Sequence, residues 1–400
     1  IFTNANSFVI TNSANTLTLD NNGLGANVSV TAGAANVIAS GVALNETTSV
    51  AGSSGTALSV PGNISGVGGL TVSGNGVFTL SGSNVYSGNT VLNLGTNGGT
   101  LALGSTNALG SGTLTIAGGN LDSTVPNLVN LNNNAQNWNG SFTFLGSQNI
   151  NMGNGSVTLA ANSTVNVLSN TLAIGGDVSG SFILTVGQAT NINGTLELSG
   201  NNSFANLTFV SGTIALGSDT ALGSAATLQF SPANINPAAT NLTLKSKDSS
   251  TRTINSAISV NAFDGPYILA GTGDLIFNGN IVSGNGYKRF YVINNSTFNG
   301  LVTDNGAPSG PVAKDGPGKL TLTANNTTTK PFRIDAGTLA LGSTTAIGSG
   351  MLTINGGGLD STVTDLVNAN NNAQTWAGSF YFAGSQNLNL GSGSVTMNTN

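Results

Sequence analysis

Residues 101–112 read LALGSTNALGSG, and residues 339–350 read LALGSTTAIGSG. The likeness extends without gaps over residues 101–160 and 339–398, a constant offset of 238 residues at which more than two thirds of the positions are identical. A third, weaker copy, GTIALGSDTALGS, spans residues 212–224. One short repeat cannot bury a hydrophobic face alone, whereas stacked repeats enclose a continuous core. The repetition therefore predicts a solenoid.

Apolar side chains recur two residues apart in short runs, as at Phe78 and Leu80 or at Leu101 and Leu103. This period is typical of a β-strand with one buried face. Gly, Asn and Ser clusters bound the runs and supply the turns that short strands need. We therefore predict an all-β fold with little or no helix. It is expected to be a right-handed parallel β-helix (β-solenoid) of roughly 15–18 coils, continuous over residues 1–400.

The composition is rich in glycine and asparagine, with 57 Gly and 58 Asn, whereas only 6% of the residues are charged and the net charge is −5. Cysteine and histidine are absent, so disulfides are excluded and the commonest metal ligand is missing. Asparagines at equivalent turns are expected to form amide ladders instead. We predict no cofactor and no metal site. No apolar run approaches the roughly 20 residues of a membrane span, so none is predicted in this chain.

A second repeated element carries a family resemblance. Residues 76–88 read GVFTLSGSNVYSG, with Asn84 and Tyr86 as its most distinctive members. Together with the LALG and ALGSG segments that follow, it resembles the passenger-associated transport repeat of autotransporter proteins, also called the autotransporter-associated β-strand repeat. The copy at 194–224 has Phe204 in place of the tyrosine, and the copy at 318–354 lacks the tyrosine and the closing glycine. The resemblance implies a parallel β-helix that is extracellular or displayed on the outer surface of a Gram-negative-type bacterium.

Positive charge is confined to one atypical segment. All nine Lys and Arg residues lie within residues 245–333, which also contain the run Tyr287, Lys288, Arg289, Phe290 and Tyr291. Arginine and aromatic faces suit anionic sugars and buried interfaces. The segment is therefore a candidate lateral contact or a site for host-surface or matrix polysaccharide; a merely solvated, widened coil is the alternative. The acidic chain, with a pI near 4.4, predicts no nucleic-acid partner.

The acidic residues are scattered, and a catalytic site is not expected. Asp264 and Asp274, with Lys288 and Arg289, form the one conceivable acid–base cluster, because the two carboxylates sit in DGP and TGDL turns close in sequence to the two cations. Several polysaccharide-cleaving enzymes use acid pairs. This cluster is therefore the candidate site of the alternative function, a polysaccharide-binding or polysaccharide-cleaving β-helix.

Other residues recur at matching repeat positions and are predicted to be structural. Asp122 and Asp360 share one position, which suggests a role in a turn. Trp138 and Trp376 share another. We expect each indole to pack at a corner between coils with its N–H bonded to a neighbouring turn. Stacking of exposed tryptophans on sugars is the alternative.

The ends of the sequence carry matching repeat phases. Residue 398 corresponds to residue 160, and residues 161–174, ANSTVNVLSNTLAI, resemble residues 5–19, ANSFVITNSANTLTL. An exposed terminal coil offers unpaired backbone groups to another strand, so copies of the chain are expected to stack head-to-tail or laterally into filaments. Because the chain opens at Ile1, it is alternatively a processed product or an excerpt of a longer polypeptide with the same repeats. The leading functional prediction is an extracellular structural or adhesive rod, or a fibre-forming surface protein.

Overall fold

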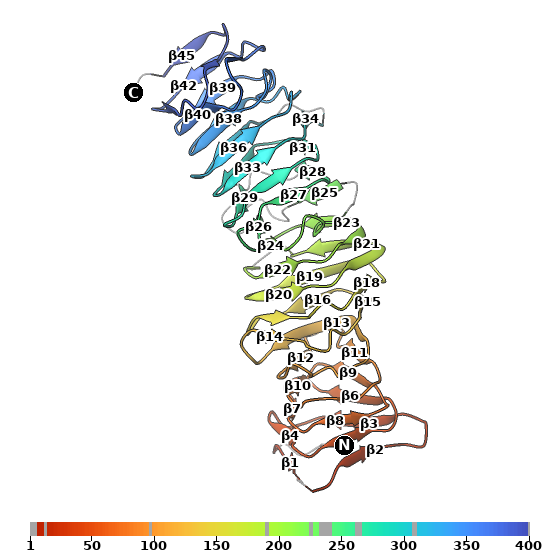
Figure 1. Ribbon diagram of the computed structural model, residues 1–400. Helices are drawn as coiled ribbons and strands as arrows, with labels where there is room; N and C mark the ends of the chain where they lie inside the picture. The colour runs from red at the N-terminus through yellow and green to blue at the C-terminus, as the bar shows by residue number, and fades with distance from the viewer. Residues whose placement is uncertain are drawn as a thin grey trace. The chain divides into compact units, whose positions relative to one another are not determined.

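The computed structural model describes residues 6–11, 14–95, 98–188, 192–223, 227–231, 242–260, 266–305 and 310–398. None of these residues is helical, and the strands stack as a parallel β-solenoid of about 16 coils (Figure 1). The prediction of an all-β solenoid is confirmed. The chain divides into two compact units: residues 1–185 with 192–205, and residues 186–191 with 206–400. A single continuous domain stays a prediction.

The first unit consists of short strands joined by turns. Its strands are β1 (Val9–Ile10), β2 (Leu17–Leu19), β3 (Ala26–Val30), β4 (Asn36–Ile38), β5 (Val42–Leu44), β6 (Thr48–Gly52), β7 (Ala57–Val60), β8 (Ile64–Gly66), β9 (Leu70–Gly74), β10 (Val77–Leu80), β11 (Thr90–Asn93), β12 (Thr100–Leu103), β13 (Leu114–Ser123), β14 (Leu128–Val129), β15 (Gln136–Trp138), β16 (Phe142–Phe144), β17 (Ile150–Asn151), β18 (Val157–Leu159), β19 (Ser163–Val167), β20 (Thr171–Ile174) and β22 (Thr195–Leu198). The strands β21 (Val178–Val186) and β23 (Ser203–Phe209) contain residues of both units.

The second unit is built in the same way. Its strands are β24 (Gly212–Leu216), β25 (Thr227–Phe230), β26 (Leu242–Ser246), β27 (Arg252–Ile254), β28 (Ala257–Val260), β29 (Pro266–Ala270), β30 (Leu275–Phe277), β31 (Ile281–Ser283), β32 (Lys288–Val292), β33 (Asn295–Phe298), β34 (Val302–Asp304), β35 (Val312–Asp315), β36 (Lys319–Leu322), β37 (Phe332–Ile334), β38 (Thr338–Leu341), β39 (Leu352–Ile354), β40 (Gly358–Ser361), β41 (Leu366–Val367), β42 (Gln374–Trp376), β43 (Tyr381–Phe382), β44 (Leu388–Asn389) and β45 (Val395–Met397).

Each strand pairs in parallel with the corresponding strand of the next coil. In the first unit, Thr48 of β6 lies beside Leu70 of β9, and Leu70 lies beside Thr90 of β11. Because side chains alternate between the faces of a strand, in-register stacking places equivalent residues of successive coils in columns. One inward column consists of Val50, Val72, Leu92, Ile116, Trp138 and Leu159. The core of the unit is therefore a set of stacked apolar columns.

The second unit has a comparable column with one unexpected member. It consists of Tyr267, Phe290, Lys314, Ile334, Ile354 and Trp376. All of these side chains except that of Trp376 are buried. A lysine thus occupies an inward position between an aromatic ring and an aliphatic side chain.

The predicted amide ladders are present at turns of the second unit. The side-chain amide of Asn278 donates to Asn255 and that of Asn299 donates to Asn278, each over 2.9 Å. The hydroxyl of Thr323 then donates to Asn299 over 2.8 Å. The turns on this edge are therefore linked from coil to coil by side chains as well as by backbone, without disulfides.

Candidate functional site

The aromatic and cationic run singled out in the sequence begins at Tyr287, one residue before β32, and continues along β32, where its side chains are divided between two faces of the strand. Lys288, Phe290 and Val292 are buried, because residues two apart share a face. Arg289, like Tyr291, is partly exposed. Only the alternate half of the run is therefore accessible at the surface.

The neighbouring coils bring charged partners to the outward residues of β32. Parallel pairing places Tyr291 beside Asp315 of β35 and aligns Arg289, Ala313 and Arg333 in one row. Asp335 follows β37 directly. We call the resulting set the outer cluster: it comprises Tyr287, Arg289, Tyr291, Asp315, Arg333 and Asp335.

Two ion pairs join the side chains of the outer cluster. The Nε of Arg289 donates to Asp315 over 2.6 Å. The guanidinium of Arg333 donates to both carboxylate oxygens of Asp335, from Nε over 2.7 Å and from a terminal nitrogen over 2.8 Å. This bidentate geometry favours arginine over lysine. The carboxylates are sheltered, with side-chain exposures of 11% and 16%, whereas the guanidinium side chains are 39% and 36% exposed. The arginines are thus paired yet open to solvent.

The tyrosines complete the cluster. The hydroxyl of Tyr287 donates to Asp335 over 3.0 Å, and the guanidinium carbon of Arg333 lies 5.0 Å from the centre of the Tyr287 ring. The corresponding distance from Arg289 to the Tyr291 ring is 5.8 Å. Both distances suit cation–π attraction. Aromatic rings and guanidinium groups are therefore held against one another on this face.

Hydrogen bonding and burial shift the pKa values of these groups. Burial raises the pKa of Asp335, but hydrogen bonds from Arg333, Asn355 and Tyr287, with the charge of Arg333, outweigh burial and hold that pKa below its usual value. Burial, followed by the negative charge of Asp335, raises the pKa of Tyr287 to about 12. At neutral pH Asp335 is therefore an ionised acceptor and Tyr287 a protonated donor.

Three lysines lie beneath the surface of the second unit: Lys288, Lys314 and Lys330, each with no exposed area. The ammonium of Lys288 donates to the carbonyl of Asn285. That of Lys314 donates to the carbonyls of Asp315, Gly316 and Ala336 over 2.9, 2.8 and 2.9 Å. Burial lowers the pKa of Lys314 to about 8, although the charge of Asp315 opposes the shift. Three carbonyls thus satisfy all three donors of this ammonium.

The described members of the candidate acid–base cluster lie apart. Asp264 lies outside the described residues. Asp274 precedes β30, which belongs to a different sheet from β32, and its carboxylate accepts the N–H of Asn295. Lys288 points inward, and Arg289 points outward to Asp315. The structure therefore does not bring Asp274, Lys288 and Arg289 together.

A second group of functional side chains connects the coils from within. Asn84 is buried; its side-chain oxygen accepts the N–H of Ile64 over 2.8 Å, and its amide donates to the carbonyl of Ala108 over 2.6 Å. Ile64 belongs to the coil before and Ala108 to the coil after. One side chain thus satisfies buried backbone groups on both neighbours, which are costly to leave unpaired.

The same asparagine recurs in the other two copies of the motif. Asn326 accepts the N–H of Val302 over 2.7 Å and donates to the carbonyl of Ala346 over 2.5 Å. Asn202 accepts the N–H of Val178 over 2.7 Å. We call these three residues the staple asparagines. Their spacing to the bonded backbone atoms explains why the motif specifies asparagine, which offers an acceptor and a donor on one short side chain.

Comparison with known proteins agrees with this geometry. The family model described as the passenger-associated-transport-repeat matches residues 70–103, 193–215 and 312–341, and each match contains a staple asparagine. The chain carries passenger-associated transport repeats. A β-solenoid with these repeats is a protein of the autotransporter passenger type, which implies secretion to the surface or extracellular space of a Gram-negative bacterium. No curated protein and no solved structure matches the chain.

The transport repeat's tyrosine lies in the core. Tyr86 has no exposed area, its hydroxyl shares a 2.5 Å hydrogen bond with Thr90, and burial raises its pKa to about 12. Phe204, its counterpart in the second transport repeat, is also buried. The ring, rather than the hydroxyl, is therefore the feature that these two repeats share.

The two aspartates that share a repeat position make matching contacts. The carboxylate of Asp122 accepts the N–H and the hydroxyl of Ser147 over 2.9 and 2.6 Å. Asp360 accepts the same groups of Ser385 over 2.9 and 2.8 Å. Each aspartate thus fixes a turn 25 residues further along the chain.

Each of the two tryptophans of the passenger is the last residue of its strand and lies in an inward column. Trp138 is buried in the column between Ile116 and Leu159. Its indole N–H donates over 3.2 Å to Gln136 of its own strand, and Trp376 bonds in the same way to Gln374 over 3.1 Å. The expectation that the N–H bonds to a neighbouring turn is therefore wrong, because a glutamine two residues earlier shares the face of the indole.

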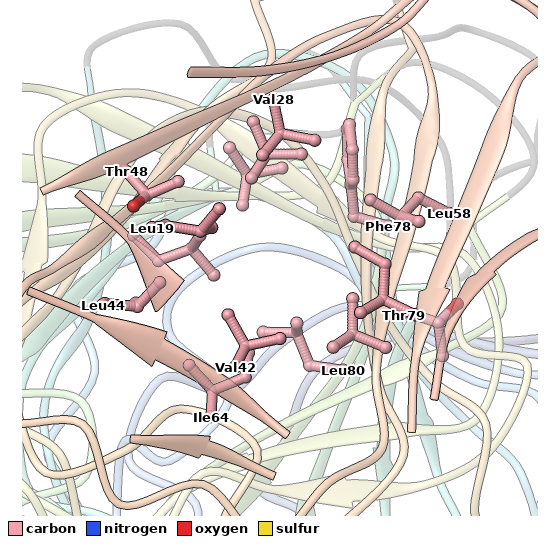
Figure 2. A pocket seen from close by; sticks show the side chains of 15 residues that line it. Leu19, Val28, Val42, Leu44, Thr48, Leu58, Ile64, Phe78, Thr79 and Leu80 are labelled. Atoms are coloured by element: carbon pink, nitrogen blue, oxygen red, sulfur yellow. The ribbon is translucent and has the colours of Figure 1, made fainter. Parts of the chain in front are cut away.

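The first unit also has a partly open apolar cavity of about 40 Å³ between its early coils. Figure 2 shows side chains such as those of Leu19, Val42, Leu44 and Phe78 around it. A cavity lined almost entirely by hydrocarbon stays dry and offers few polar groups that could orient a ligand. The outer cluster is therefore the better candidate for binding.

Two features are absent from the described part of the passenger. No group of three or more Asp, Glu, His or Cys side chains is placed to hold a metal ion there. Nor does that part of the chain contain a helix with the length and hydrophobicity of a membrane span.

Proposed function

We propose that the passenger is an extracellular structural and adhesive protein. The observation that carries the proposal is the staple asparagine, which ties one coil to both neighbours through buried hydrogen bonds. These ties need neither disulfides nor long-range charge, so reductant and salt are expected to leave the stack intact. A stack stabilised in this way is suited to bear load outside the cell and to present polar faces to a surface.

Adhesion and mechanical strength can be tested together. Beads coated with the purified chain should bind host cells or matrix, and the force needed to unfold one molecule should be the same with and without dithiothreitol or added salt. The Asn84→Ala/Asn326→Ala double variant should unfold at lower force, whereas Asn299→Ala, at an exposed turn, should match the parent. Beads that bind no cell or matrix preparation would contradict the adhesive role.

Self-association, end to end or side by side, belongs to the same proposal. Val129 and Leu131 support the side-by-side form, because these side chains lie two residues apart and are 40% and 61% exposed, and apolar patches favour contact with other chains. Sedimentation should show oligomers that dissociate in Leu131→Ser. A monomer at all concentrations would contradict this part of the proposal.

The second candidate function is polysaccharide binding or cleavage within residues 245–333. The observation that favours it is the outer cluster, where aromatic rings, guanidinium groups and carboxylates meet on one face. Incubation with polysaccharides, followed by assays for new reducing ends and for retention of the protein on the polymer, separates binding from cleavage. Retention without new ends would indicate a binding protein.

A further inference from the structure

The outer cluster is one part of a regular patch that extends over several coils. One residue before each of β32, β35, β37 and β39 stands an apolar side chain, in the order Tyr287, Pro311, Pro331 and Met351. The pairing of Lys288 with Pro311 and of Val312 with Pro331 places these residues on successive coils. Coils repeat about every 4.8 Å. The patch therefore offers a partly exposed apolar row along the stacking direction.

Beside this row runs a row of hydrogen-bonding groups. It contains Arg289 and Arg333, whose guanidinium side chains are 39% and 36% exposed. Each guanidinium has five N–H donors, and the bonds to Asp315 and Asp335 use only some of them. An apolar stripe next to a stripe of donors matches a sugar chain, whose C–H faces are apolar and whose edges carry hydroxyl groups.

The charges of the outer cluster balance, since Arg289 and Arg333 face Asp315 and Asp335. The carboxylates are also fixed: the N–H of Gly316 donates to Asp315 over 2.7 Å, and Tyr287 and Asn355 donate to Asp335 over 3.0 and 2.7 Å. An anionic ligand would have to compete with these carboxylates for each guanidinium. A hydroxyl group can accept from a guanidinium and donate to a carboxylate while both ion pairs remain.

We propose that the patch binds an uncharged polysaccharide laid along the stacking direction of the coils. This inference rests on the adhesive function proposed above and names its ligand class. The side chains need little ordering on binding, because strand pairing and ion pairs already hold them, which lowers the entropic cost of association. Tyr287 and Arg333 are the binding residues with the largest expected effect.

Isothermal titration of the full chain with hexasaccharides tests the proposal. The uncharged probes are cello-, manno- and chitohexaose, and the acidic probes are hyaluronate and heparin oligosaccharides. At least one uncharged probe should bind with an affinity that does not change with salt, since no counterions are released. Tyr287→Ala should weaken binding on the order of tenfold. Arg333→Lys keeps the positive charge but loses the planar guanidinium with its paired N–H donors, and it should weaken binding less.

The matched control is Thr115→Ala, an outward position on β13 of the first unit that should leave binding unchanged. Circular dichroism establishes that each variant is folded. Binding of acidic probes alone, with an affinity that falls as salt rises, would overturn the proposed ligand class. Equal affinity of Tyr287→Ala and the parent, or no binding of any probe, would overturn the site. Adhesion of coated beads that persists in either case would leave the adhesive function standing, so the two failures are distinguishable.

Discussion

The coil that carries Asn84 and the coil that carries Asn326 keep the same side-chain hydrogen bonds but place different side chains around them. Both asparagines bond to the coil before and the coil after. Two residues later the first has the buried ring of Tyr86, whereas the second has the small Thr328. In the second coil the ring belongs to Phe332 instead, at the start of β37. The hydrogen bonds of the asparagine are thus kept, whereas the buried aromatic ring comes from a position further along the chain in the second coil.

The two coils also differ beside the staple asparagines. In the first, Gly66 and Gly88 allow a close approach of backbones, since a Cβ at either position would overlap backbone atoms of the previous coil. The corresponding residues in the second are Asp304 and the buried Lys330. Burial lowers the pKa of Lys330, and the charge of Asp304 opposes the shift. Close packing in one unit is therefore replaced by compensating charges in the other, and the choices are expected not to be interchangeable.

The largest loss of stability is expected when the aspartate of the second coil is placed at the matching position of the first coil. Gly66→Asp should destabilise the first unit by at least about 4 kcal/mol, because Gly66 has φ +105° and its Cβ would overlap the oxygen of Leu44. Urea unfolding followed by Trp138 fluorescence in a Trp376→Phe background measures this. Gly55→Asp is the control, since Gly55 has φ +78° but no atom within 4 Å of its Cβ. Equal costs at both positions would show that backbone conformation alone matters.

A smaller loss is expected when the charge is removed from the second coil. Asp304→Ala should cost about 3 kcal/mol, because Lys330 stays buried without its carboxylate and the hydroxyl groups of Thr328 and Thr329 lose the acceptor that they share. Trp376 fluorescence in a Trp138→Phe background reports on this unit. The double variant Asp304→Ala/Lys330→Met should recover most of the loss. No recovery would mean that the threonine bonds, not the lysine, account for it.

The staple asparagines, which both coils contain, should lose similar amounts of stability when they are replaced. Asn84→Ala and Asn326→Ala should each cost about 2 kcal/mol in their own unit, because each leaves a buried N–H and a buried carbonyl without a partner. The same two tryptophan reporters measure both. Asn299→Ala, in the exposed amide ladder, should cost less than about 0.5 kcal/mol. A staple variant no worse than this control would contradict the role assigned to the asparagine.

The smallest expected effect is a pH response of opposite sign in the two units. Burial lowers the pKa of Lys314 to about 8, so between pH 8 and 10.5 the unfolded state binds more protons, and the stability of the second unit should rise by about 1 kcal/mol from pH 7 to 9. Burial raises the pKa of Tyr86 to about 12. Above pH 10 its unfolded form loses the proton first, so the first unit should lose about 1 kcal/mol from pH 9 to 11.

Urea unfolding at each pH, with one tryptophan reporter per unit, measures these slopes. Lys314→Met should abolish the rise in the second unit, and Tyr86→Phe should abolish the fall in the first. A rise that survives Lys314→Met would assign it to another group.

The sequence predicts the fold well because its period is local. Alternation at Phe78 and Leu80 identifies strands, and the offset of 238 residues between long repeats identifies stacking. Alternation also contained a signal that was missed: Lys288 shares a face with Phe290, so it had to be buried if the phenylalanine was. Grouping it with Arg289 as a surface residue ignored that period.

The remaining parts of the outer cluster could not be read from the sequence. The pairing of Arg289 with Asp315 depends on how many residues each coil contains, and that number varies. Tyr267 stacks on Phe290 after 23 residues, whereas Val312 stacks on Phe332 after 20. Turn lengths are decided by packing of the whole coil, which no local pattern specifies. Register between coils is therefore the information that only the structure supplies.

The side-chain hydrogen bonds within residues 101–160 have a consequence for how such proteins evolve. Asp122 with Ser147, and Trp138 with Gln136, are partners that all lie inside this block, and residues 339–398 repeat both pairs. A gene duplication that copies the whole block transfers each donor together with its acceptor, so the new coils keep these bonds. A duplication that broke off between the aspartate and its serine would separate them. Lineages of such proteins are therefore expected to lengthen by whole blocks.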